Sequence, residues 1–132
     1  MSSFHIGNTF VNNPTSTVTS HLWIVISNPF DNPEQIAIVN LTSWRDKAVQ
    51  LNDTSCIVEV GDHEFVRKKS YISYRDARIV FVKEMQGLMH NGLICFRVDC
   101  SDEFFDKILD GAENSRFLPL EVRKVLEQQE LI

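Results

Sequence analysis

The fold is decided by two apolar runs that lie close together in the chain, HLWIVIS at residues 21–27 and IAIVNLTS at residues 36–43. Both runs have the length and the β-branched composition of buried strands, and the loop between them is rich in Asn, Pro and Asp. In an antiparallel pair, the start of one strand lies beside the end of the other. We therefore expect His21 to share one rim of a sheet with the hydroxyl groups of Thr42 and Ser43.

Further strand and helix patterns surround this hairpin. Segments typical of strands are expected at residues 4–11 (an edge strand), 55–60, 65–74, 77–81 and 93–98. Helical spacing and capping residues predict helices from Val82, from Ser101 (with a break over residues 111–115) and from Pro119. We therefore expect a mainly β protein with short helices (α+β), in which an antiparallel sheet of about five or six strands curls into a small barrel.

The composition limits the class of protein. The 132 residues are most simply one domain spanning residues 1–132, without a repeat or a linker. A net charge of −5 argues against polyanion binding over the whole surface, although a local basic groove stays possible. With no leader pattern and no long apolar run, we expect no signal peptide, no membrane association and a cytoplasmic location.

The cysteines and acidic residues do not indicate a metal site. Cys56, Cys95 and Cys100 are odd in number and have no ligand spacing with one another or with a histidine, so we expect reduced thiols. Carboxylates that could bind Mg²⁺ are scattered, at Asp53, Glu59, Asp62 and Glu64. We therefore expect neither a metal nor a cofactor.

Several short motifs occur in an order that is similar to one family. Residues 7–10 (GNTF) are similar to an opening Gly-Asp-hydrophobic strand, residues 21–27 to an Arg-Pro-Val-Val-Val-Leu-Ser strand, and residues 38–43 to a Val-x-Pro-Leu-Thr-Ser strand. Residues 70–80 and 101–112 are similar to a later strand region and to the terminal helices. The chain therefore resembles, over nearly its whole length, the MazF/PemK toxins of bacterial toxin–antitoxin pairs, which share a small SH3-like barrel with CcdB.

The resemblance implies a divergent toxin-like protein, because Asn8 replaces the usual Asp and His21 stands where the catalytic Arg is expected, with no Pro after it. It also implies a metal-independent endoribonuclease that cleaves single-stranded RNA, forms a homodimer and is held in check by a cognate antitoxin. The CcdB branch of the fold implies an alternative: a non-catalytic barrel that acts by binding a protein, as a gyrase poison does, or an inactive interaction module.

Metal-independent RNA cleavage needs one group to deprotonate the ribose 2′-hydroxyl, one to protonate the leaving oxygen, and one to stabilise the charge on the phosphate. The Arg and Thr of the family site map onto His21 and Thr42. His63, after a Gly-Asp turn, is the natural second proton-transfer group, and Thr42 or Ser43 can bind a phosphate oxygen. The alternative is that His21 is a strand-entry residue and His63 a surface turn residue.

A stretch that combines basic and aromatic residues follows His63. Five basic residues and two tyrosines lie in it: Arg67, Lys68, Lys69, Arg75, Arg78, Tyr71 and Tyr74. Trp44, with Arg45 and Lys47, repeats the combination after Ser43. Basic side chains follow a phosphate backbone and aromatic rings stack on bases, so we predict RNA binding by Ser43, Trp44, Lys68, Lys69, Tyr71 and Tyr74. The alternative is a solvated strand face with the tyrosines half in the core.

Overall fold

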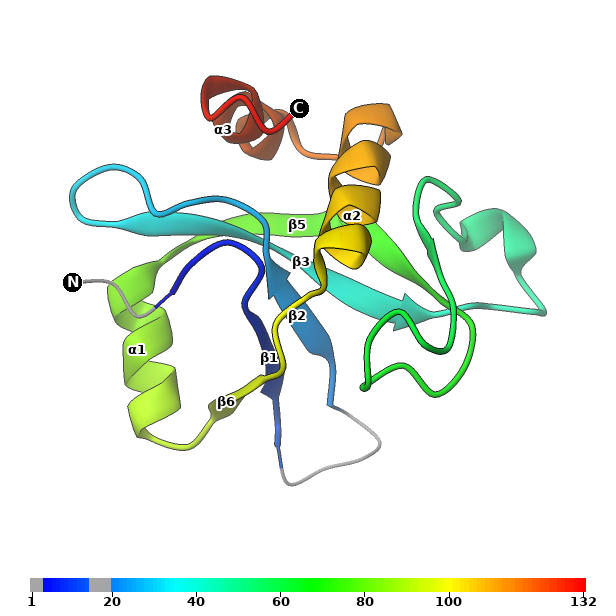
Figure 1. Cartoon of the computed structure of the whole chain (residues 1–132), viewed down its shortest axis with the longest axis horizontal. Coiled ribbons are helices and arrows are strands. Elements are labelled where there is room, and N and C mark those ends of the chain that lie inside the picture. Colours follow the sequence, from blue (N-terminus) through cyan, green and yellow to red (C-terminus); the bar gives the residue numbers. More distant parts are fainter. Residues whose placement is uncertain (1–3, 15–19) are drawn as a thin grey trace.

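The computed structural model describes residues 4–14 and 20–132, and it shows a curled antiparallel sheet of six strands with three helices (Figure 1). The strands are β1 (Thr9–Asn12), β2 (Leu22–Val25), β3 (Gln35–Ser43), β4 (Ile57–Val58), β5 (Ser70–Phe81) and β6 (Ile94–Arg97), in the order β4-β5-β3-β2-β1-β6. The helices are α1 (Val82–His90), α2 (Asp102–Asn114) and α3 (Leu120–Gln128), and a short 3-10 helix covers Val49–Leu51. The α+β class is confirmed.

The predicted hairpin forms the centre of the sheet. β2 pairs antiparallel with β3, with Trp23 opposite Asn40 and Val25 opposite Ile38. Most of β3 is buried, because it also pairs with β5 on its other side. The expectation of an antiparallel hairpin is therefore confirmed, and it sets the register of the elements around it.

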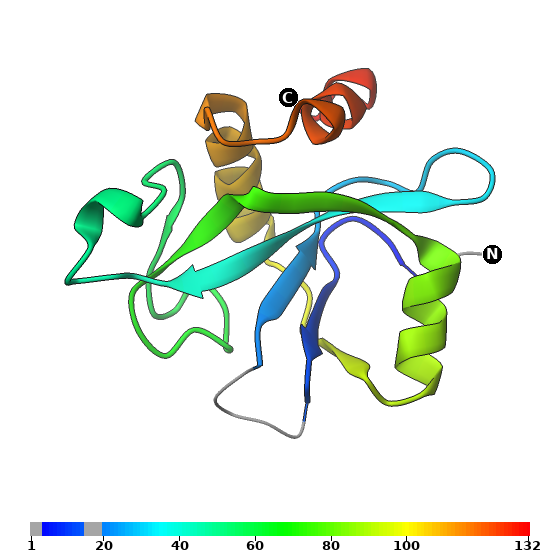
Figure 2. The same cartoon turned by 180° about the vertical axis from the view of Figure 1, so that it is seen from behind.

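The sheet is curled but open, like half of a barrel. β4 and β6 lie at its two ends, and in the described residues they do not pair with each other. The N-terminal strand is not at an edge as expected, because β6 pairs with β1 and covers it. β5 is one strand where two were predicted; it runs beside β3 along the sheet (Figure 2), and a β-bulge shifts its register between Ile38 and Asn40 of β3.

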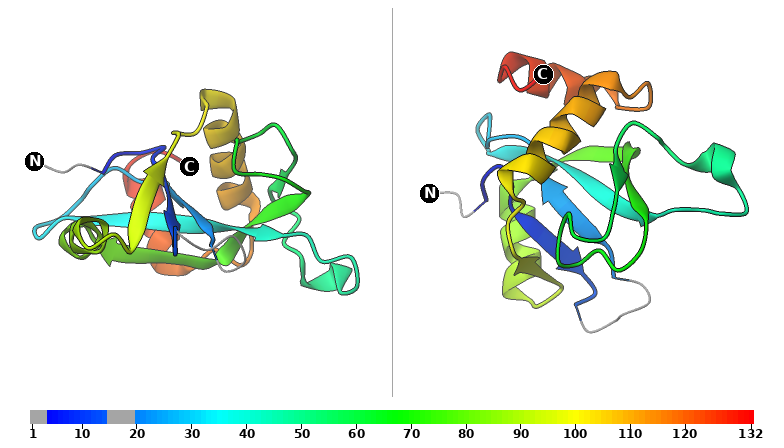
Figure 3. Two further views of the ribbon diagram at one scale, coloured as in Figure 1. Left: turned by 90° about the horizontal axis from the view of Figure 1, so that it is seen from below. Right: turned by 45° about the vertical axis from the view of Figure 1, so that its right-hand side comes forward.

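Each face of the sheet carries its own hydrophobic core. The larger core lies under α2 and α3 and includes Leu41, Tyr74, Phe104 and Leu126. The smaller core packs residues of β1, β2, β3 and β6 against α1. Figure 3 shows α1 at one end of the sheet and α2 rising from it further along the strands. None of the described helices is long and apolar enough to cross a membrane.

Two local signals position α2. The Ser101 side chain accepts a hydrogen bond from the Phe104 N–H at 3.1 Å, which caps the helix as predicted. The expected break over residues 111–115 was wrong, because the helix continues through Gly111, where the chain passes against Tyr74 and Cys56 too closely for a side chain. Arg123 of α3 then donates to the carbonyl groups at the end of α2, so the two helices are held together.

Candidate functional site

A cleft of about 640 Å³ opens at the rim where β2 begins and β3 ends. The loop between β4 and β5, which lies beside the start of β2 in Figures 1 and 3, forms one of its walls. The lining residues are Pro14, Ser20, His21, Leu41, Ser43, Glu64, Phe65, Val66, Arg67, Lys68, Ser70 and Arg97. Leu41 and Val66 also belong to the larger core, so the apolar part of the cleft is continuous with the packed interior.

The cleft is positively charged although the protein is acidic. Three cations line it (Arg67, Lys68 and Arg97) with one carboxylate, Glu64, in a chain whose net charge is −5. In the described part of the chain the single ion pair joins Lys107 to Asp62, neither of which lines the cleft, so none of the three cleft cations is in an ion pair. Such a site favours an anionic ligand.

His21 stands at the mouth of the cleft, as the strand pattern predicted. Its backbone is fixed to β1, because its N–H donates to Asn12 Oδ1 at 2.8 Å and its carbonyl accepts from the Asn12 N–H at 3.4 Å. The side chain is exposed, and no hydrogen bond joins the imidazole to another described residue. A fixed backbone with a free imidazole suits proton transfer to and from a ligand.

The two hydroxyl residues at the end of β3, Thr42 and Ser43, lie on opposite faces of the strand. Ser43 lines the cleft beside its strand partner Ser70 of β5. Thr42 does not line it, because successive side chains of a strand point to opposite faces. The Thr42 hydroxyl donates instead to Asn40 Oδ1 at 3.3 Å. Ser43, and not Thr42, therefore lines this cleft together with His21.

His63 is buried, with 5% of its surface exposed, whereas we expected an exposed turn residue. Its ring packs against Phe104 of α2, and its Nε2 donates to the Val98 carbonyl at 2.7 Å. The next two residues of the wall, Glu64 and Phe65, line the cleft, but His63 does not. This placement removes His63 as the second proton-transfer group beside His21, and Glu64 is the titratable residue that the cleft offers in its place.

The basic and aromatic residues that were predicted to bind RNA lie in three separate places. Lys68 lines the cleft with Arg67. Tyr74 is fully buried and donates its hydroxyl hydrogen to the Ile108 carbonyl at 2.6 Å, and burial raises the pKa of this phenol well above its ordinary value. Tyr71 is also buried. Neither tyrosine ring is available to stack on a base, so this part of the expectation was wrong.

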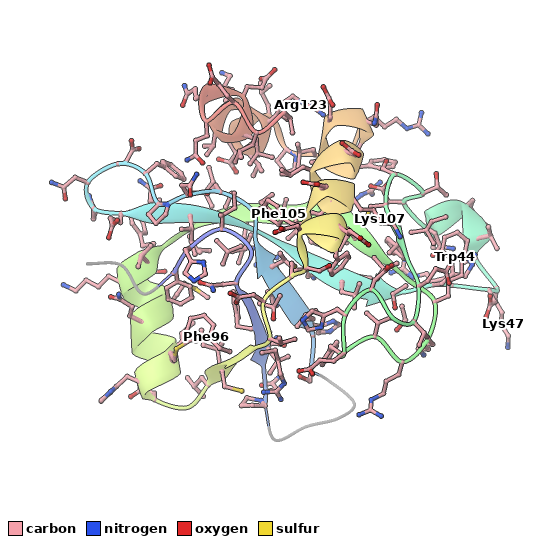
Figure 4. All side chains as sticks on the ribbon, in the orientation of Figure 1. Trp44, Lys47, Phe96, Phe105, Lys107 and Arg123 are labelled. Atoms are coloured by element: carbon pink, nitrogen blue, oxygen red, sulfur yellow. The ribbon has the colours of Figure 1, made fainter. Side chains whose placement is uncertain are left out.

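Trp44 and Lys69 form the third place. The Lys69 ammonium lies 4.1 Å from the centre of the Trp44 ring, and Tyr71 meets that ring edge-on at 6.3 Å between ring centres. Figure 4 shows Trp44 with Lys47 at one end of the molecule, far from Phe96. Neither Trp44 nor Lys69 lines the cleft, so the structure does not bring them together with His21.

Sequence reasoning missed two charged residues of the cleft. Glu64 follows His63 directly, but the sequence pattern suggested it only as one of several scattered carboxylates that could bind Mg²⁺. Arg97 comes from β6, which reaches the cleft because β6 pairs with β1, with Arg97 opposite Thr9. The alternation of β6 could have placed Arg97 on one face, but nothing in the sequence predicts which strand β6 joins.

Two other chemistries have no support among the described residues. No group of three or more His, Cys, Asp or Glu side chains is placed to bind a metal ion in residues 4–14 and 20–132. Burial raises the pKa of Cys56 to about 11 and the pKa of Cys100 to about 12, so both thiols stay protonated at neutral pH and are poor nucleophiles.

Comparisons with known proteins found no match to this chain among protein-family models, curated proteins or solved structures. The function is therefore argued from the cleft itself.

Proposed function

We propose that the protein is a metal-independent endoribonuclease that cleaves single-stranded RNA in this cleft. The observation that carries the proposal is the position of His21, whose imidazole shares a cleft with Arg67, Lys68 and Arg97; within residues 4–14 and 20–132 none of these three cations is in an ion pair. An imidazole can transfer a proton near neutral pH, and unpaired cations attract a phosphodiester.

The residues of the cleft can supply each part of the reaction. His21 and Glu64 act as the acid and base: one removes the proton of the 2′-hydroxyl, and the other protonates the 5′-oxygen that leaves. Arg97, from β6, stabilises the negative charge that develops on the phosphate oxygens. Ser43 donates a hydrogen bond to one of those oxygens.

The remaining lining residues favour a nucleic acid strand over a small anion. Phe65 offers a half-buried ring that a base can stack against, next to Arg67 and Lys68, which would contact the backbone on both sides of the scissile phosphate. Because an unpaired base is needed for stacking, this arrangement selects single-stranded RNA.

The biological setting follows from the sequence resemblance. We place the chain near the MazF/PemK toxins, with an SH3-like barrel as the fold type, a homodimer as the working form, a cytoplasmic site of action and a cognate antitoxin as inhibitor. The order of motifs along the chain supports this placement, and the curled antiparallel sheet is consistent with it.

The direct test is cleavage of a long, unstructured RNA in the presence of EDTA by the wild type and by His21→Ala and Glu64→Gln. Loss of a general acid or base lowers such rates by about 10²- to 10⁴-fold, so both variants should be nearly inactive. The matched controls are His90→Ala and Glu84→Gln, which change exposed residues of the same types on α1, outside the cleft.

Three results would overturn the proposal. The first is a folded wild type that leaves the RNA intact. The second is cleavage that is present in every variant at the same rate, which indicates a contaminating nuclease. The third is activity that depends on an added divalent cation, which would place the chemistry elsewhere.

A second candidate function rests on the free edge of the sheet. β6 has no neighbour on its outer side among the described residues, and three large apolar side chains at this edge are exposed: Leu93 by 56%, Phe96 by 37% and Val98 by 52%. Unpaired backbone groups beside apolar side chains favour the addition of a strand from a protein partner.

This candidate predicts a non-catalytic barrel that acts by binding a protein, as the CcdB branch of the fold does. The substitution Phe96→Lys should abolish association with that partner, or with a second copy, in sedimentation experiments, and neither the wild type nor this variant should cleave RNA. Loss of toxicity on Phe96→Lys, with full toxicity retained in His21→Ala, would favour protein binding over RNA cleavage.

A further inference from the structure

We infer that His63 is the positioning residue of the cleft and a pH-sensitive latch: in its neutral form it holds the wall that carries Glu64 and Phe65, and protonation releases that wall. The structural part of this inference stands on the geometry of His63 alone. Its consequence for catalysis rests on the proposed RNA cleavage.

The hydrogen bonds of His63 fix the tautomer of its ring. Nδ1 lies 3.0 Å from the backbone nitrogen of Phe65, and a backbone N–H can only donate, so Nδ1 must be an unprotonated acceptor. Nε2 lies 2.7 Å from the Val98 carbonyl, which can only accept, so Nε2 carries the hydrogen. The Thr9 hydroxyl, 3.4 Å from Nε2, donates its own hydrogen to the same carbonyl at 2.7 Å.

These contacts tie the cleft wall to the sheet. Through Nδ1 the ring closes a turn of the wall, which also contains the hydrogen bond from the Val66 N–H to the His63 carbonyl at 3.0 Å. Through Nε2 it anchors that turn to Val98, directly after β6 and next to Arg97. The side of the cleft that carries Glu64 is thereby held against the side that carries Arg97.

Protonation is incompatible with this arrangement. A second hydrogen, on Nδ1, would point at the Phe65 N–H, so two donors would face each other and the turn would have to open. The ring is 5% exposed and packs against Phe104, so water cannot easily replace the lost acceptor. Protonation of the ring would therefore destabilise the wall and reduce its order.

The hydrogen-bond partners found for the His63 ring are uncharged groups: the Val98 carbonyl, the Phe65 N–H and the Thr9 hydroxyl. The charged residues next to His63 in the wall are Asp62 and Glu64, with Lys107 on α2 and Asp99 after Val98. Asp62 is bonded to Lys107 at 3.0 Å, and Asp99 accepts a hydrogen bond from Asn8 at 3.0 Å. Glu64 is exposed at the cleft. In the described part of the chain none of the four is hydrogen-bonded to the ring.

The test measures the wall directly by NMR and needs no RNA. The ¹⁵N shifts of the His63 ring should show the Nε2–H tautomer at about pH 7.5. Between about pH 7.5 and about pH 5.5 the protection factor of the Phe65 amide, its hydrogen exchange relative to an unstructured chain at the same pH, should fall by about tenfold or more. The amide of Ile24 in the buried strand β2 should show no such fall.

The matched variant is His63→Asn. The Asn side-chain oxygen accepts from the backbone N–H two residues on in an Asx-turn, which reproduces the Nδ1 contact without a titratable group. The Phe65 protection factor should be independent of pH in this variant, and the acidic side of the RNA cleavage profile should move to lower pH.

The Nδ1–H tautomer in the wild type would overturn the inference, and this measurement does not depend on any variant folding. An unchanged Phe65 protection factor in the wild type, or an equal fall in His63→Asn, would also overturn it. Failure of RNA cleavage alone would overturn the proposed function and leave the latch standing, because the NMR readouts do not involve RNA.

Discussion

The cleft borders the core under α2, and the two regions differ in whether their polar and charged groups have partners within the protein. In the core, Tyr74 is bonded to Ile108, and the carboxylate of Asp53 accepts from Ser115 at 3.0 Å. Every buried side-chain nitrogen and oxygen atom in the described part of the chain has a partner. In the cleft, Arg67 and Lys68 are exposed and form no ion pair with any other described residue. The polar groups of the core are hydrogen-bonded within the protein and stabilise the fold, whereas the two cations of the cleft are available to bind a ligand.

In the core, the substitution Gly111→Ala should cause the largest loss of stability. A methyl group there would run into the Tyr74 hydroxyl, and it would lie 2.8 Å from Cys56 Cβ and 2.9 Å from the Ser55 carbonyl oxygen. Overpacking of this kind costs about 1–3 kcal/mol of unfolding free energy, measurable by urea denaturation. The control is Gly87→Ala in α1, where nothing lies within 4 Å and the change should stabilise by about 0.5–1 kcal/mol. Equal effects of the two substitutions would contradict the packing described for α2.

A second test of the core removes the hydroxyl group of Tyr74. Tyr74→Phe leaves the Ile108 carbonyl without its donor and should cost about 1–2 kcal/mol of unfolding free energy. Tyr71→Phe is the matched control, because no hydrogen bond to the Tyr71 hydroxyl is found among the described residues, and it should change stability by less than about 0.5 kcal/mol. Neither substitution should weaken RNA binding. A loss of binding on Tyr74→Phe would mean that the Tyr74 hydroxyl contacts the RNA, which the burial of this side chain excludes.

In the cleft, a substitution should weaken ligand binding and leave the stability of the fold nearly unchanged. Arg97→Ala should weaken binding of a single-stranded oligonucleotide by about fivefold and lower the slope of log K against log salt by about one unit, because one phosphate contact is lost. Its unfolding free energy should change by about 0.5 kcal/mol or less. Arg116→Ala, an exposed arginine outside the cleft, serves as the control in the same fluorescence anisotropy titration. Equal salt slopes for the two variants would remove Arg97 from the binding site.

The smallest effect concerns the thiols. A raised pKa keeps a thiol protonated, so at about pH 8 only about one in a thousand Cys56 side chains is a thiolate, and Cys100 has still fewer. Cys95 lies beside the cleft, where its sulfur accepts from Arg97 at 3.0 Å and is partly exposed. Native protein should therefore react with a thiol reagent mainly at Cys95, as shown by mass spectrometry of the digest. Rapid labelling of Cys56 would mean that the core under α2 opens readily.

Local patterns predicted much of the fold. The β2–β3 hairpin follows from two apolar runs and a turn-rich loop, and the start of α2 follows from Ser101 with acidic residues in its first turn. His21 and Ser43 could be placed at one rim because antiparallel pairing fixes which ends of two strands meet. These features depend on residues that are close in the sequence.

The rest depends on contacts between distant segments. The pairing of β6 with β1 brings Arg97 to the cleft, and no local signal specifies it. The burial of His63 needs Val98 and Phe104, which lie on other elements. Tyr74 was assigned to a surface because basic residues surround it, although alternation along a strand allows a charged face and a buried face in the same segment.

The measurement that tests the central claim most directly is an NMR titration with a single-stranded RNA oligonucleotide whose 2′-hydroxyls are methylated, so that it binds without being cleaved. We predict that the amide shifts change at His21, at Ser43, along residues 64–70 and at Arg97, with saturation at one oligonucleotide per site. Changes confined to the region of Trp44, or no changes at low salt, would contradict the assignment of this cleft as the RNA site.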